Sequence, residues 1–162
     1  MQAVTGESDP KKLGLLVDAF KRSYDNEGYA LSTSYAGISE MLECLRLTGK
    51  CLHVATNKRL KPTERILQFF DWGKYFQTVY AIDKTTPAYL NKAHMIESMI
   101  SNQGLQSKNC FYIGDRLEDS EAANFNKLPF IYVGWGYGVE DEQIKNHRMA
   151  RTPNDLLELL CS

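Results

Sequence analysis

Three sets of polar residues in the sequence could together handle a phosphate group. Thr56 and Asn57 end a short apolar run, Asp115 and Asp119 lie four residues apart after another such run, and Lys92 lies at an expected helix start. Hydroxyl and amide groups donate hydrogen bonds to phosphoryl oxygens, and a lysine adds a positive charge. Carboxylate oxygens are the ligands that Mg²⁺ prefers in proteins. The residue types therefore predict a phosphate site beside a magnesium site.

Short apolar runs alternate with amphipathic stretches along the chain and position these side chains. The runs have the length of buried strands and lie at 51–56, 78–82, 110–113 and 129–133, and the helical patterns cover 12–29, 37–49, 62–73, 91–104, 121–126 and 152–160. Strands that alternate with helices predict an α/β fold, in which a parallel sheet carries helices on both faces. Ligands of such sheets bind at the carboxyl ends of the strands, where Thr56 and Asp115 are expected.

The composition limits the classes of partner and the location. The 162 residues are 43% apolar and carry a net charge of −1, so we expect a globular protein with no basic field to attract nucleic acid or an anionic membrane. No stretch approaches the roughly 20 apolar residues of a membrane span and the N-terminus has no apolar signal, which predicts a cytoplasmic location. The four cysteines form no close pair, so we expect buried, reduced thiols without zinc or disulfides.

The order and setting of these residues resemble the haloacid dehalogenase superfamily, in its phosphoglycolate-phosphatase-like branch. The second motif of that family, a strand that ends in Ser or Thr, is similar to Val54–Lys58. The third, a lysine at a helix start, is similar to Asn91–Ala93, with Lys84 as a weaker candidate. The fourth, Gly-Asp-x-x-x-Asp after a strand, is matched by Gly114–Asp119, and the loop Gly134–Gly138 is similar to that branch.

The resemblance implies a fold, an activity and a role for each residue. It implies a three-layer, Rossmann-like parallel sheet and a Mg²⁺-dependent phosphatase that acts on a small phosphorylated metabolite, such as 2-phosphoglycolate, through an aspartyl-phosphate. Asp115 would bind the metal, and Asp119 would bind the metal or orient Lys92 for catalysis. Thr56 and Lys92 would hold the phosphoryl group as catalytic residues, with Asn57 as a further phosphate ligand.

The first motif of that family, Asp-x-Asp-Gly-Thr after an apolar strand, is absent from the 162 residues. In the family its first aspartate is the nucleophile and its second is the general acid and base. The nearest imitation, Asp25–Tyr29, lies in a helical pattern with no apolar strand before it. We therefore expect the N-terminal strand and most of the helical cap to be missing, with 1–34 as a remnant of the cap and 35–162 as the α/β core.

Two functional hypotheses follow from this missing motif. The chain is part of a phosphatase whose nucleophile belongs to an upstream segment, or it is a catalytically inactive remnant that binds phosphate, metal or a protein partner. In the family the missing strand lies between the strands that correspond to 52–56 and 110–113. Its absence would leave unpaired backbone groups on both, so we expect the chain to be poorly stable, or to close the gap by collapse, swapping or self-association through the open sheet.

Overall fold

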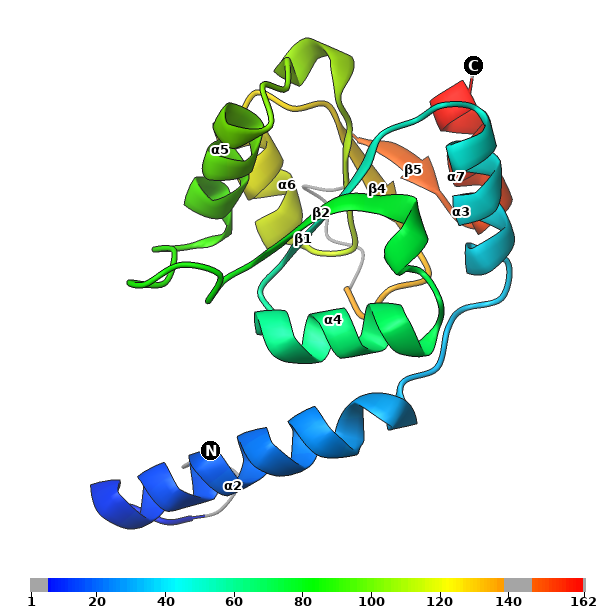
Figure 1. The fold of residues 1–162 in the computed structure, drawn as a ribbon. Coiled ribbons are helices and arrows are strands. Elements are labelled where there is room, and N and C mark those ends of the chain that lie inside the picture. The colour runs from blue at the N-terminus through cyan, green and yellow to red at the C-terminus, as the bar shows by residue number, and fades with distance from the viewer. Residues whose placement is uncertain (1–5, 139–146, 162) are drawn as a thin grey trace.

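The computed structural model describes residues 6–138 and 147–161, and Figure 1 shows how their elements are arranged. The strands are β1 (Leu52–Thr56), β2 (Phe76–Ala81), β3 (Tyr112–Gly114), β4 (Phe130–Val133) and β5 (Arg148–Ala150). The helices are α2 (Pro10–Asn26), η1 (Gly28–Leu31), α3 (Ile38–Leu47), α4 (Leu60–Phe69), η2 (Gly73–Tyr75), α5 (Lys92–Asn102), η3 (Ser107–Asn109), α6 (Leu117–Phe125) and α7 (Pro153–Cys161). The predicted alternation of strands and helices is confirmed, and β5 is an additional strand.

All strand pairs are parallel, but the described strands form two separate ladders. Strand β1 pairs with β2, so that Thr56 lies opposite Ala81. Strand β3 pairs with β4, which in turn pairs with β5. Within the described residues no ladder joins β1 to β3. The parallel α/β fold is therefore confirmed, and its described strands are divided between β1 and β3, where a gap is expected from the sequence.

Strand β4 shows how two helical layers enclose the sheet. Phe130 and Tyr132 pack into a hydrophobic core with α5 and α6, whereas Ile131 and Val133 pack into a second core with α3 and α7. Successive side chains of a strand point to opposite faces, so a strand covered on both faces is apolar throughout. Figure 1 shows α5 and α6 on one side of the strands and α3 and α7 on the other. The three predicted layers are present.

Helix α2 lies outside these layers, beside α4 (Figure 1). Asp9 caps its first turn by accepting hydrogen bonds from two backbone N–H groups. Apolar side chains of this helix stay exposed, among them Leu15 at 69% and Phe20 at 56%. Within α2, all of which is described, Asp25 is the only buried residue. The assignment of 1–34 to a helical cap stays a prediction.

Two expectations from the composition can be compared with the fold. Cys44, Cys51 and Cys161 are exposed and Cys110 is half-buried, so the expected burial of the thiols is wrong. Cys44 gives the physical reason, because it lies on the outer face of α3, while the opposite face of that helix fills the core. In the part of the chain that the structure describes, no helix is both long and apolar enough to span a membrane.

Candidate phosphate and metal site

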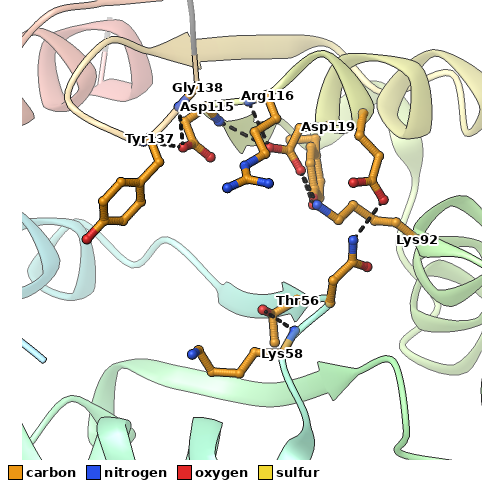
Figure 2. Close-up of polar contacts among 11 residues, drawn as sticks. Thr56, Lys58, Lys92, Asp115, Arg116, Asp119, Tyr137 and Gly138 are labelled. Carbon is orange, nitrogen blue, oxygen red and sulfur yellow. Dashed lines mark hydrogen bonds and ion pairs between the residues drawn. The ribbon is translucent and has the colours of Figure 1, made fainter. Parts of the chain in front are cut away.

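The predicted site residues lie at the carboxyl edge of the strands, where the two ladders face each other. Thr56 is the last residue of β1, and Asp115 directly follows β3. Lys92 is the first residue of α5, and Asp119 lies in the first turn of α6. Figure 2 shows Asp115, Asp119 and Lys92 together, with Thr56 facing them from the other ladder. Elements distant in the sequence thus bring the predicted residues to one edge of the sheet.

Lys92 and Asp119 form a buried ion pair. The Nζ atom of Lys92 lies 2.5 Å from Oδ1 of Asp119, and only 8% and 4% of the two residues are exposed. The other oxygen of Asp119 accepts hydrogen bonds from the backbone N–H groups of Asp115 and Arg116, each at 3.1 Å. These donors hold the carboxylate, and the carboxylate holds the ammonium group. Of the two roles expected for Asp119, these contacts favour the orientation of Lys92.

Two neighbouring residues, Tyr112 and Gly114, accommodate the carboxylate of Asp119. The hydroxyl of Tyr112 lies 3.5 Å from its Oδ1 atom. Burial raises the pKa of Tyr112 far above its usual value, and the charge of Asp119 adds to this effect, so the phenol stays neutral and donates a hydrogen bond to the carboxylate. A Cβ atom at Gly114 would lie 2.5 Å from the Asp119 side chain, so only glycine leaves room for it.

Asp115 is held by the loop after β4. Its Oδ2 atom accepts hydrogen bonds from the backbone N–H groups of Tyr137 at 2.7 Å and Gly138 at 3.1 Å (Figure 2). A Cβ atom at Gly136 would collide with the Asp115 side chain, and one at Gly138 would collide with the Asp115 carbonyl oxygen. The glycines predicted to shape a loop near the pocket therefore let two backbone amides reach this carboxylate.

We expect the substitution Gly138→Ala to weaken the binding of Mg²⁺ about tenfold, because the new Cβ atom would push the loop off Asp115 and remove its two amide donors. A Mg²⁺ titration followed by tryptophan fluorescence measures this effect. Gly134→Ala is the matched control in the same loop, since a Cβ there would lie 3.8 Å from the nearest atom, an ordinary contact. Equal affinities of the two variants would contradict the role given to this loop.

The residues after β1 form contacts that the sequence did not specify. The Oγ1 atom of Thr56 accepts a hydrogen bond from the backbone N–H of Lys58 at 3.1 Å. The side-chain amide of Asn57 donates to Oε1 of Glu118 at 2.7 Å, so it bridges the two ladders at this edge. The weaker motif candidate Lys84 donates instead to a backbone carbonyl of β2 at 2.6 Å. The contacts of Lys92 and Lys84 therefore agree with the choice of Lys92.

Sequence reasoning did not single out Arg116, Glu118 or Lys58, which also line this edge. Figure 2 shows the Arg116 side chain extending from the start of α6 toward the side on which Thr56 lies. Arg116 and Glu118 stand inside the fourth motif, so their positions were available from the sequence, although their directions were not. No pattern signals the contact between Asn57 and Glu118, which are 61 residues apart.

The donor set fits part of a Mg²⁺ site. One oxygen of Asp115 is held by two amides, and its other oxygen makes no hydrogen bond to the residues that the structure describes. Carboxylate oxygen is a ligand that this hard cation prefers. Within residues 6–138 and 147–161, no group of three or more His, Cys, Asp or Glu residues gathers to hold a metal. A cation at Asp115 would therefore need further oxygen ligands, such as water.

The chain matches the model of the haloacid dehalogenase-like hydrolase family over residues 1–133. It therefore belongs to this family, and the resemblance drawn from the three motifs is confirmed.

Individual relatives include proteins of several activities. A 5'-nucleotidase of Pseudomonas aeruginosa is 30% identical in an alignment of 145 residues that covers 88% of this chain and 64% of that protein. A phosphoglycolate phosphatase of Synechococcus elongatus is 27% identical in an alignment of 126 residues that covers 76% of this chain and 58% of that protein. The chain thus spans less than two thirds of the length of these curated relatives.

Solved structures share the fold. A predicted phosphatase from Clostridium acetobutylicum superposes with a TM-score of 0.82 at 25% identity, covering 95% of this chain and 72% of that chain. A putative phosphatase from Clostridium difficile gives a TM-score of 0.83 at 25% identity, covering 98% of this chain and 75% of that chain. Nearly all of the present chain therefore corresponds to part of larger structures that are named as phosphatases.

Proposed function

We propose that this chain carries the phosphate-binding and metal-binding part of a Mg²⁺-dependent haloacid dehalogenase-type phosphatase. Its substrate would be a small phosphomonoester such as 2-phosphoglycolate, and the proposed location is the cytoplasm. The reaction would pass through an aspartyl-phosphate formed on a carboxylate that these 162 residues do not contain. Family membership and the relatives named as phosphatases support the reaction class.

The observation that carries this proposal is the position of the polar residues beside the division of the sheet. Thr56 ends one ladder, and Asp115 and the Lys92–Asp119 pair lie at the end of the other. A strand inserted in parallel between β1 and β3 would satisfy the unpaired edges of both. The carboxyl end of that strand would lie between the hydroxyl of Thr56 and the carboxylate of Asp115, which is the place for a nucleophile.

Each residue then has a distinct task. The ammonium group of Lys92, held by Asp119, would neutralise charge on the phosphoryl oxygens, and the hydroxyl of Thr56 would donate a hydrogen bond to one of them. Asp115 would supply one ligand to Mg²⁺. When bound, the cation would reduce the negative charge of the phosphate and orient it for attack. These groups stabilise an anionic transition state, whereas the nucleophile comes from the inserted strand.

Binding of inorganic phosphate by residues 1–162 in the presence of Mg²⁺ tests this function. We expect weak but measurable binding in a titration followed by ³¹P NMR. Thr56→Val should raise the dissociation constant about tenfold, because it removes one charge-assisted hydrogen bond. Thr78→Val is the matched control, since the hydroxyl of Thr78 contacts His53 on the neighbouring strand instead. An unchanged dissociation constant for Thr56→Val would remove Thr56 from the site.

The alternative is that the chain is an inactive remnant that binds phosphate, metal or a protein partner. The two functions differ when the missing strand is added to the chain, because a remnant would still show no turnover. The proposed partners are a small phosphorylated metabolite and, while the edges of β1 and β3 stay unpaired, further copies of the chain.

A further inference from the structure

We propose that Asp25 is a positioning residue for the loop that carries Thr56, here called the phosphate loop (Thr56–Arg59). Asp25 belongs to the sequence segment that most nearly imitates the missing nucleophile motif. Both of its carboxylate oxygens are engaged by Arg59, so it is not free to attack phosphorus. Its role as a positioning residue rests on the proposed function, because it acts on the site through Thr56.

The contact between Asp25 and Arg59 is a partly buried, bidentate ion pair. The Nη1 atom of Arg59 lies 2.9 Å from Oδ2 of Asp25, and Nη2 lies 2.5 Å from Oδ1. Asp25 is 6% exposed, and Lys61 adds a second positive charge at 4.0 Å. The hydrogen bonds from Arg59 lower the pKa of Asp25, so the carboxylate stays charged at neutral pH. Bidentate pairs of this kind fix direction as well as distance.

A second contact joins the same two segments. The Nζ atom of Lys58 donates to the hydroxyl of Tyr24 at 2.8 Å and lies 4.8 Å from the centre of the Tyr24 ring. Two consecutive residues of the phosphate loop therefore bind two consecutive residues of α2. Because Asp25 is the only buried residue of this fully described helix, these polar contacts anchor the end of α2 to the loop.

The same loop residues determine where the hydroxyl of Thr56 lies. The backbone N–H of Lys58 donates to the Oγ1 atom of Thr56. The backbone carbonyl of Arg59 accepts from the hydroxyl of Thr63 at 2.8 Å, which ties the end of the loop to the first turns of α4. A shift of Arg59 would therefore move the donor that holds Thr56. Through Asp25, the position of α2 sets the geometry of the phosphate site.

The test uses Asp25→Asn in residues 1–162 and follows backbone amide exchange by mass spectrometry. Asparagine has nearly the same shape, but it loses the charge and faces Arg59 with an amide donor. Exchange in peptides covering 56–60 should become about tenfold faster, because the loop opens more often. The dissociation constant for inorganic phosphate should rise about fivefold. The amide-exchange measurement needs no phosphate. If the unsubstituted chain binds no phosphate, only the proposed function is contradicted, and the positioning role of Asp25 is still tested by the exchange rates.

Two controls separate positioning from stability. Glu43→Gln removes another paired carboxylate, which binds Arg46 on the exposed surface of α3, and should leave both measurements unchanged. The double variant Asp25→Asn with Arg59→Gln removes the unpaired charge and, in the chain extended by the missing strand, should recover the melting temperature while phosphate binding stays weak. Recovery of phosphate affinity together with stability, or exchange at 56–60 unchanged by Asp25→Asn, would overturn the inference.

Discussion

Purified residues 1–162 are expected to show no Mg²⁺-dependent hydrolysis of p-nitrophenyl phosphate, whereas the same chain with an added N-terminal strand ending in Asp-x-Asp-Gly-Thr should hydrolyse it. The gain should be at least about a thousandfold over the chain alone, because the phosphate site then acquires the nucleophile for the covalent step. A phosphatase assay on both proteins at equal concentration measures it. Robust activity of residues 1–162 alone would require a different nucleophile.

The added strand should also change the physical state of the protein. Beside the division of the sheet, Phe111 is 40% and Ile113 is 37% exposed, and the facing edges of β1 and β3 form no ladder with another strand of residues 6–138 and 147–161. We therefore expect residues 1–162 to self-associate or to melt without cooperativity, and the extended protein to be a monomer with a cooperative melt. Light scattering and calorimetry distinguish these states.

Two variants separate folding from chemistry in that experiment. A strand in which both motif aspartates are asparagine should restore the monomer and the cooperative melt without turnover. In the active extended protein, Asp115→Asn should remove most of the activity and leave the melt nearly unchanged, because Asp115 is half-buried and is held through backbone amides. Turnover by the extended protein in which both motif aspartates are asparagine would show that the activity does not depend on the motif.

The sequence predicted the layers of the fold because β4 and its helices carry strong patterns. The continuous apolar run of β4 has the length of a buried strand, and the helices have one apolar face at helical spacing. Strand β5 was missed because it has three residues, of which only Ala150 is buried, and so short a segment shows no alternation. Helix α6 begins at Leu117 instead of near Glu121, because the motif turn and the helix start overlap at Asp119.

The site was predictable in its residue types but not in its contacts. Spacing placed Asp119 near either a metal or Lys92, and only the packing of α5 against α6 brings the ammonium group to that carboxylate. Residue types do not indicate that backbone amides bind Asp115, apart from the glycines that make room for this contact. The ion pair of Asp25 with Arg59 joins residues 34 apart, and local periodicity carries no information on such pairs.

Breaking the pair of Lys92 and Asp119 should cost far more stability than breaking a surface pair of the same length. In the strand-extended protein we expect Lys92→Met to lower the free energy of unfolding by about 3–5 kcal/mol, because the buried carboxylate of Asp119 would lose its counter-ion. Lys74→Met is the matched control. Lys74 also lies 2.5 Å from its partner Asp71, but the two side chains are 52% and 82% exposed, so the loss of stability should be small.

Urea unfolding followed by tryptophan fluorescence measures both losses, and a double-mutant cycle isolates the interaction. Adding Asp119→Asn to Lys92→Met should recover part of the lost stability, because the uncompensated charge is then gone. Phosphate affinity should stay low in that double variant, since the ammonium group that Asp119 holds is absent. Equal losses for Lys92→Met and Lys74→Met would show that the buried carboxylate is satisfied without Lys92, and its role in holding the ammonium group would have to be abandoned.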